Sequence, residues 1–327
     1  MDSSFAGRSL IISSGRCGST LLSDLIAEHA GTLSVQEYFM SVQPEAMVDD
    51  VLTGAEYWAI LSSPKPDLST LIRIGLPPKE IRYPSDGRWA GNLTELPRIL
   101  AITLPSISSD PDGLYDVLAS TVPEFPSQPA GRHHHMFLDL LTRLTGKRQW
   151  IERSGGSSAM SPYLLRTFRT GKIVYLTRNW ADTALSMSRH SSFQLIQLRV
   201  EFLGLCGFDP YRTDPGPGQS VPPDLAHLLP DRLTAEGLLE RGRETGRFLA
   251  LCAFLESQTE QALADMPPHD LLRLRYEDLV ADPAGELGRL GRFFEFDDWA
   301  EWASKVAHRV TATPRADRPA LADVRVV

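Results

Sequence analysis

A glycine-containing turn and three arginines are the residues whose types and spacing point most directly to chemistry. The turn, 15–20 (GRCGST), follows the apolar run 8–14 (RSLIISS) and precedes leucines at helical spacing. Arg16 lies in the turn, and Arg153 and Arg178 each end another short apolar run. Glycines let a backbone approach a ligand closely, and the free N–H groups at a helix start bind anions. The pattern predicts a site for an anionic ligand.

The turn lacks the signature of a nucleotide triphosphatase or kinase. A P-loop of that type places Gly-Lys before its Ser or Thr, and the lysine reaches the nucleotide phosphates. Here Gly18 is followed directly by Ser19, and the cation stands two residues earlier as Arg16. A P-loop-type small-molecule kinase is therefore kept only as an alternative, which magnesium dependence would reveal.

The elements that must position these residues alternate between strand and helix. Short apolar runs predict five strands, at 8–14, 33–36, 149–152, 172–177 and 271–275. The amphipathic segments between these runs predict helices. This alternation indicates an α/β fold with a P-loop-like parallel sheet flanked by helices. Ligands of such sheets bind beyond the carboxyl ends of the strands, so one crevice is expected to collect the arginines and Glu37.

Two segments interrupt the alternation. We expect one domain over residues 1–327, with a mostly helical insertion at 41–131 and a breaker-rich, flexible loop at 191–232. These segments should build the pocket for a second ligand. Their aromatic residues suit a sugar or a partly apolar compound, namely Tyr57, Trp58, Trp89 and Phe193.

On these motifs the sequence resembles the sulfotransferases that use 3'-phosphoadenylyl sulfate (PAPS). Their phosphosulfate loop has a basic residue, a small residue, Gly, Ser or Thr, and Thr, which residues 16–20 match. Their 3'-phosphate motif has Arg and, eight residues later, Ser, as Arg178 and Ser186 do here. A late R-Y-E-D-L motif with a following proline corresponds to residues 275–279 and Pro283.

The resemblance implies the sulfotransferase fold, PAPS as co-substrate and transfer of a sulfonate group to a hydroxyl of a small-molecule acceptor, which is a sugar, a lipid or a natural product. The residues it implies for binding the donor are Arg16, Cys17, Gly18, Ser19, Thr20, Arg178 and Ser186. The sulfonate carries one negative charge, less than a terminal phosphate. We therefore expect arginines to replace magnesium and no metal to be needed.

The nearest likeness is to the branch of bacterial trehalose sulfotransferases and tyrosylprotein sulfotransferases. It implies that Glu37 is the general base, that Arg16 stabilises the leaving phosphate and that Arg153 is a third catalytic residue. Members of the family often carry Lys followed by Thr-Pro or Asp-Pro at the place of Arg153, so Arg-Ser-Gly departs from the pattern.

Other residues leave alternatives open. One of the histidines 133–135 is the second candidate for the base, because some relatives use histidine. Arg309, Arg315 and Arg318 in the tail are candidates for closing over the phosphates. A non-catalytic sulfotransferase-like binding protein is the other alternative function, although Arg16, Arg178, Ser186 and Glu37 are all retained.

Composition limits the partners. A net charge of -8 argues against a nucleic-acid-binding protein, which needs a basic surface. The 3 cysteines are far apart, which excludes a disulfide framework and fits a reducing compartment. No signal peptide and no membrane-length apolar run is visible, so we expect a cytoplasmic protein with no membrane insertion. The sequence leaves the acceptor and a homo-oligomer open.

Overall fold

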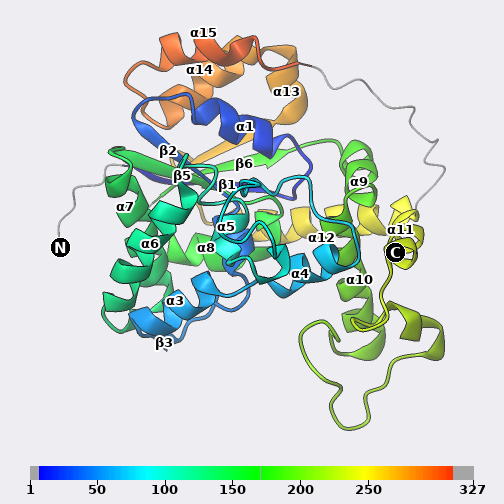
Figure 1. Ribbon diagram of the computed structural model, residues 1–327. Coiled ribbons are helices and arrows are strands. Elements are labelled where there is room, and N and C mark those ends of the chain that lie inside the picture. Colours follow the sequence, from blue (N-terminus) through cyan, green and yellow to red (C-terminus); the bar gives the residue numbers. More distant parts are fainter. Residues whose placement is uncertain (1–6, 170, 312–327) are drawn as a thin grey trace.

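A parallel β-sheet forms the centre of the computed structural model, which describes residues 7–169 and 171–311 (Figure 1). The 5 strands of this sheet are parallel and lie in the order β2-β5-β1-β6-β7. Their bounds are β1 Arg8–Ser13, β2 Thr32–Gln36, β5 Gln149–Arg153, β6 Lys172–Thr177 and β7 Leu271–Arg275. The parallel α/β fold predicted from the alternating elements is confirmed. A second, 2-stranded sheet pairs β3 Val51–Leu52 with β4 Gln128–Pro129.

Helices cover both faces of the central sheet (Figure 1). They are α1 Ser19–Ile26, α2 Tyr38–Val42, α3 Gly54–Ser62, α4 Pro66–Arg73, α5 Arg98–Ala101, α6 Pro111–Thr121, α7 Ala130–Leu144, α8 Ser161–Thr167, α9 Trp180–Ser188, α10 Ser191–Cys206, α11 Ala235–Gly242, α12 Thr245–Leu263, α13 Tyr276–Ala281, α14 Pro283–Phe293 and α15 Trp299–Ala307. Short 3-10 helices are η1 Leu93–Glu95, η2 Val122–Glu124, η3 Ser157–Met160 and η4 Pro223–Leu228.

The alternation of side chains along β1 explains how the sheet is buried on both faces. Leu10 and Ile12 belong to a core cluster shared with α7, α8 and the helices between residues 41 and 131. Ile11 belongs to another cluster, shared with α1, α14 and α15. Successive strand residues point to opposite faces, so a continuous apolar run is what a two-sided sheet requires.

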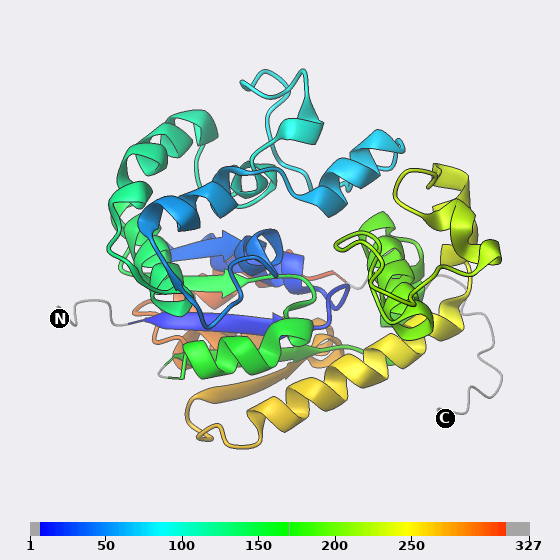
Figure 2. The same ribbon diagram turned by 90° about the horizontal axis from the view of Figure 1, so that it is seen from below.

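The carboxyl ends of the strands carry the site. In Figure 2, β1 runs toward the side of the molecule where α4 and α10 lie. Strand register brings Gln36 beside Arg153 and Thr177 beside Arg275. The loops that follow the strands therefore meet at one edge of the sheet.

The prediction of a loop over residues 191–232 was wrong for residues 191–206. Residues Ser191–Cys206 form the helix α10, which buries Phe193, Leu195, Leu198 and Phe202. These residues recur at helical spacing, and the chain leaves the helix at Gly207, whose φ is 74°. The segment 41–131 contains helices α3 to α6, as predicted. No helix in the described part of the chain is long and apolar enough to cross a membrane.

Candidate functional site

The turn between β1 and α1 has an unusual backbone conformation. Gly15, Arg16 and Gly18 all have left-handed φ angles, of 83°, 56° and 89°. A Cβ atom on Gly18 would lie 2.4 Å from the Tyr276 ring, and one on Gly15 would lie 2.4 Å from Phe193. Glycine is therefore required at both positions. The first N–H groups of α1 have no partner within the helix and can bind an anion.

Arg16, Arg178 and Ser186 lie together although they come from separate elements. Arg16 Nε donates to Ser186 Oγ at 3.2 Å, and Arg178 Nη1 donates to the carbonyl of Arg16 at 3.2 Å. The guanidinium of Arg178 lies 4.7 Å from the centre of the Tyr276 ring, which holds it in place. Its Nε is buried and has no hydrogen-bond partner among the described residues. That free donor faces no internal acceptor and is suited to an anionic ligand.

These three residues line a groove of about 900 Å³. Lys79 and Arg189 add two more cationic side chains to its wall, and Leu76, Leu239 and Val280 add apolar ones. Three acidic residues, Glu80, Asp182 and Glu277, also line the groove, so its four Arg and Lys side chains outnumber its carboxylates by one. Positive charge beside apolar surface suits a ligand with phosphate groups and a flat ring.

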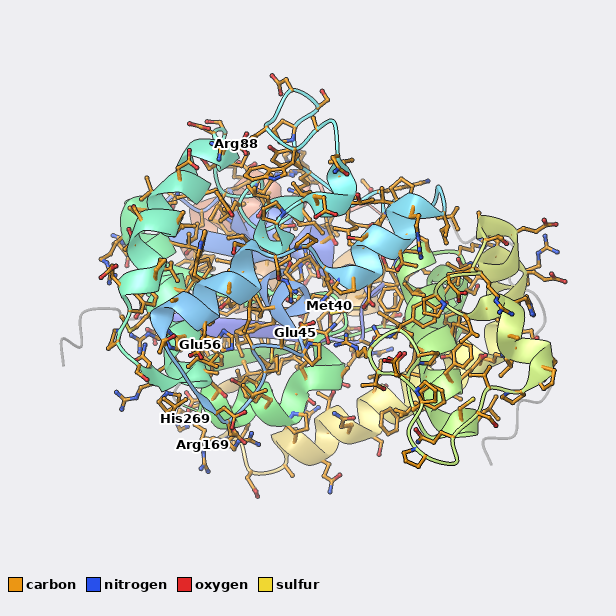
Figure 3. All side chains as sticks on the ribbon, turned by 60° about the horizontal axis from the view of Figure 1, so that its bottom comes forward. Met40, Glu45, Glu56, Arg88, Arg169 and His269 are labelled. Atoms are coloured by element: carbon orange, nitrogen blue, oxygen red, sulfur yellow. The ribbon has the colours of Figure 1, made fainter. Side chains whose placement is uncertain are left out.

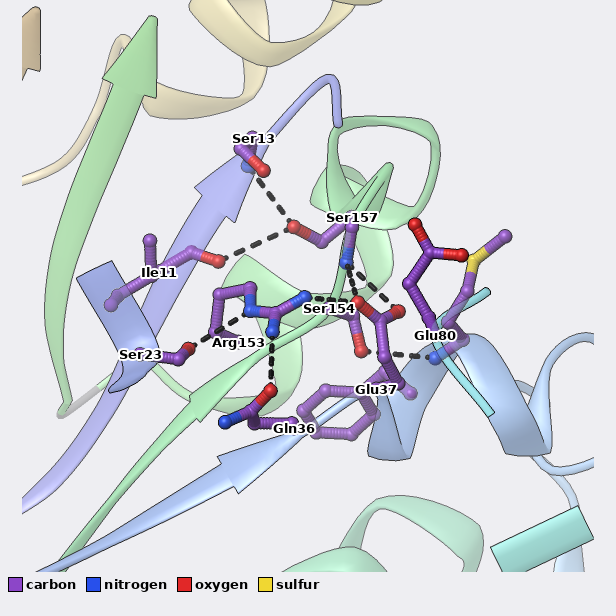
Figure 4. Close-up of polar contacts among 12 residues, drawn as sticks. Ile11, Ser13, Ser23, Gln36, Glu37, Glu80, Arg153, Ser154 and Ser157 are labelled. Atoms are coloured by element: carbon purple, nitrogen blue, oxygen red, sulfur yellow. Dashed lines mark hydrogen bonds and ion pairs between the residues drawn. The ribbon is translucent and has the colours of Figure 1, made fainter. Parts of the chain in front are cut away.

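Glu37 and Arg153 form an ion pair at the ends of neighbouring strands (Figure 4). Arg153 Nη1 donates to Glu37 Oε1, and the N–H of Gly155 lies 3.0 Å from both carboxylate oxygens. Arg153 is buried and also donates to Ser23 Oγ at 2.9 Å and Gln36 Oε1 at 2.8 Å. The carboxylate of Glu37 is therefore fixed from one side, and Oε2 keeps a lone pair for another donor.

A buried carboxyl group supports the backbone of Glu37. Glu37 has a left-handed φ of 57° and immediately precedes α2. Glu152 Oε1 accepts from the N–H of Phe39 at 3.3 Å and from Ser154 Oγ at 2.6 Å, and Ser154 Oγ accepts from the N–H of Met40 at 3.0 Å. Burial raises the pKa of Glu152 to about 8, so its carboxyl group is neutral at pH 7. These contacts cap α2 and hold the turn at Glu37.

Glu37, Arg16 and Arg153 line one cavity of about 150 Å³, which is separate from the groove but adjoins it. Met40 also lines this cavity, and Figure 3 shows it near the middle of the molecule, whereas Arg88 and His269 lie at the periphery. Three residues line both spaces: Arg16, Glu80 and His190. Ligands in the groove and in the cavity would meet at these three side chains.

Glu80 is the acidic partner of Arg16, and the sequence did not predict its role. Its Oε1 accepts from Arg16 Nη1 at 2.9 Å and from His190 Nε2 at 2.8 Å. Burial raises the pKa of Glu80, but the hydrogen bond from His190 and the charges of His190 and Arg16 outweigh it and lower the pKa to about 2. Glu80 thus carries a negative charge beside Arg16, where the cavity and the groove meet.

No local spacing signal marks either His190 or Glu80. His190 lies between two helices, after the end of α9 and immediately before α10, so helical periodicity does not place it beside Ser186. Glu80 lies in an irregular segment between α4 and η1 without periodic pattern, so nothing local marks it.

Several predicted residues lie elsewhere. The Cys17 side chain is fully buried in the core cluster of α1 and α14, and burial raises its thiol pKa, so only its backbone remains near the anion site. Arg309 pairs with Glu28 at the far end of α1, at 2.9 Å. Arg315 and Arg318 lie outside the described residues.

None of the histidines 133–135 is among the described residues that line the cavity or the groove. His133 Nε2 donates to the carbonyl of Leu52, and His134 Nε2 donates to that of Ala46. Burial lowers the pKa of His134 to about 3. The geometry therefore favours Glu37 over these histidines as the base.

Comparison with known proteins gives a family model and several solved structures that match most of the chain. The family model described as the sulfotransferase domain matches residues 7–317. Similar solved structures include a sulfotransferase domain from the curacin biosynthetic pathway, with 18% identity, 88% of this chain and 74% of that chain covered, and a TM-score of 0.45. Another is the sulfotransferase domain of the Synechococcus PCC 7002 olefin synthase, with 16% identity, coverage of 90% and 75%, and a TM-score of 0.41. No curated protein sequence matches the chain.

Proposed function

Because the chain belongs to the sulfotransferase family, we propose that it transfers a sulfonate group from PAPS to a hydroxyl group of a small-molecule acceptor. The observation that carries this proposal is the position of Arg16, which lines both the groove and the cavity. A donor bound in the groove and an acceptor bound in the cavity would meet at this arginine. We also propose a cytoplasmic location, which the free thiols of Cys17, Cys206 and Cys252 support.

The groove has the groups that a nucleotide bisphosphate needs. Arg178 and Ser186 would hold the 3'-phosphate, and the unpartnered Nε of Arg178 is a donor for it. At the junction with the cavity, Arg16, which lines both spaces, and Ser19 and Thr20, which line the cavity, would hold the phosphosulfate together with the backbone N–H groups of Cys17 and Gly18. Gly15 and Gly18 let Phe193 and Tyr276 pack directly against the turn.

PAPS supplies a sulfonate joined to its 5'-phosphate through an oxygen. A new bond forms between the acceptor oxygen and sulfur while the bond from sulfur to the phosphate oxygen breaks, and that oxygen keeps the electron pair. Arg16 stabilises the charge that develops there, and a group in this role typically contributes about 3 kcal/mol. Glu37 accepts the proton of the acceptor hydroxyl, a step worth roughly two to four powers of ten in rate.

Arg153 completes the proposed catalytic group by holding Glu37. Its guanidinium and the N–H of Gly155 fix the Glu37 carboxylate on one side, so the remaining oxygen lone pair can face the cavity. The ion pair also keeps the Glu37 side chain in one rotamer, so the carboxylate is already positioned for proton transfer. The position of Glu37 at the end of β2 supports the proposed kinship with the trehalose and tyrosylprotein branch.

Arginines take the part that a divalent cation plays in phosphoryl transfer. Arg16 and Arg178 lie in contact at the anion site, and the transferred sulfonate carries only one negative charge. No metal is therefore part of the proposal.

Binding of adenosine 3',5'-bisphosphate, the desulfonated donor, tests the proposal. Calorimetry should show this ligand binding more tightly than AMP, because only it has a 3'-phosphate for Arg178. Arg178→Ala should weaken the bisphosphate by about tenfold to a hundredfold and leave AMP unchanged, since a hydrogen bond to a charged group contributes about 1.5–3 kcal/mol. Arg166→Ala, which removes an exposed arginine paired with Asp49, is the control. Equal affinity of the unaltered protein for AMP and the bisphosphate would contradict the proposal.

A further inference from the structure

The wall of the cavity is aliphatic. Where α4, α10 and the segments around residues 81 and 102 enclose it, the side chains are Leu68, Leu71, Ile81, Ile102, Leu195 and Ile196. Phe193 is the one aromatic residue among the described residues that line it. It lies against Gly15 at the end near the anion site. The rest of the wall thus offers no flat ring on which a sugar can stack.

The aromatic residues expected to bind a sugar are used elsewhere. Tyr57 is fully buried and lies 4.7 Å from the His133 ring. Trp58 and Trp89 both pack on Tyr115, at centroid distances of 5.1 Å and 5.2 Å. Tyr57, Trp58 and Trp89 are therefore not among the described residues that line the cavity.

Three charged side chains in the wall, away from the anion site, already have partners. Lys65 Nζ donates to the carbonyls of Ser41 and Gln43, at 3.2 Å and 2.9 Å. Arg98 donates to Glu45 at 2.8 Å and also to the backbone and side chain of Ser63.

Asp67 completes this pattern, because it accepts from Arg199 Nη1 at 2.5 Å. A sugar would bury several hydroxyl groups against an aliphatic wall whose charged side chains are already paired with other groups, which is costly. A hydrocarbon surface meets no such cost.

We propose that the acceptor is an aliphatic or alicyclic alcohol, not a sugar. This inference rests on the proposed sulfonate transfer and narrows its acceptor to one chemical class. The hydroxyl lies at the end of the cavity lined by Arg16 and Glu37, and the hydrocarbon lies along α4 and α10. Sugars are excluded because a ring with several hydroxyl groups leaves most of them without a partner in the cavity.

A matched pair of alcohols tests the inference. Cyclohexylmethanol and methyl glucoside both carry a primary hydroxyl on a six-membered ring, and only the second adds further hydroxyls. With labelled PAPS, the protein should transfer sulfonate to cyclohexylmethanol with at least a tenfold higher kcat/KM. Along butanol, hexanol and octanol, kcat/KM should rise about fourfold per added methylene until the cavity is filled.

Two variants in similar surroundings test whether the acceptor binds in this cavity. Leu68→Asn places a polar group in the wall, and it should lower kcat/KM for hexanol about tenfold while the affinity for adenosine 3',5'-bisphosphate stays the same. Leu114→Asn on α6 is the control, because Leu114 is also partly buried against the same core cluster and does not line the cavity. Equal losses in both variants would mean that Leu68 acts through stability, and would overturn its place in the acceptor site.

The outcomes separate the inference from the proposed function. Preference for methyl glucoside, with the bisphosphate bound normally, overturns the inference and leaves sulfonate transfer standing. If the bisphosphate itself does not bind, the proposed function fails. In that case, calorimetry of hexanol with the protein alone still tests whether the cavity binds an aliphatic alcohol. If hexanol binds and Leu68→Asn weakens the binding, the result supports an aliphatic ligand in the cavity. If hexanol does not bind, the inference is overturned.

Discussion

Replacing Glu80 with glutamine should strengthen the binding of adenosine 3',5'-bisphosphate. The Glu80 carboxylate is paired with Arg16, the side chain proposed to meet the donor's phosphate. A donor must either displace this carboxylate or bind beside its negative charge. In both cases the Glu80 carboxylate weakens binding of the anionic ligand. Glutamine has nearly the same shape without the charge, so the variant should bind the ligand more tightly.

The contact geometry sets the size of the effect. The nitrogen and oxygen of the pair are 2.9 Å apart, and the two side chains are 33% and 30% exposed. Two unit charges about 4 Å apart attract by about 4 kcal/mol at an effective dielectric constant of about 20. Ion pairs that are exposed to solvent contribute only about 0.2–1 kcal/mol. A pair that is one-third exposed lies near the upper end of that second range, at about 1 kcal/mol, which is about a fivefold decrease in Kd.

Calorimetry at low and high salt measures this change. The gain should shrink as salt increases, because screening weakens the pair and its competition with the ligand. Glu45→Gln is the control, since Glu45 belongs to the same insertion and pairs with Arg98 but lines neither the groove nor the cavity. Unchanged or weaker binding in Glu80→Gln, with Glu45→Gln unaffected, would refute the reasoning and make Glu80 a structural partner of Arg16.

Two more predictions concern the acidic residues at the end of β2 and β5. Glu37→Gln should keep the affinity for adenosine 3',5'-bisphosphate and lower turnover by about two orders of magnitude or more, and normal turnover would exclude Glu37 as the base. Glu152→Gln should remove a pH dependence of stability measured by urea unfolding. The pKa of Glu152 is about 8 in the folded protein against an ordinary 4.5, so the folded state keeps a proton that the unfolded state has lost between these values. The stability therefore falls as pH rises from about 4.5 to 8, by at most about 5 kcal/mol, and an identical slope in the variant would contradict the buried neutral carboxyl.

Local sequence was enough for the sheet and for the anion-binding turn. The run 172–177 was predicted as a strand and is β6, and 271–275 is β7. Strand and turn signals come from a few adjacent residues, whose side-chain period and backbone freedom do not depend on distant partners. The glycines at positions 15 and 18 were predicted to form a tight turn, and both have left-handed backbone angles in the structure.

The sequence also located most of the proposed site residues. The carboxyl ends of parallel strands meet at one edge, so polar residues that follow such strands converge there. This rule brought Arg16, Glu37, Arg153 and Arg178 together before any contact was known. Ser186 came from the resemblance to the family's 3'-phosphate motif, and in the structure it lies on α9 and accepts a hydrogen bond from Arg16.

Only the tertiary structure decided how these residues are paired. Arg16 and Glu80 are 64 positions apart, and Glu37 and Arg153 are 116 apart. No short-range pattern records such a pairing, because it depends on how an irregular segment folds back over the sheet.

The wall of the cavity was decided in the same way. The aromatic residues of the insertion are directed into the core, and aliphatic residues of α4 and α10 replace them at the cavity. A residue's type says that it prefers burial, but the packing of the whole chain decides whether it is buried in the core or against a ligand.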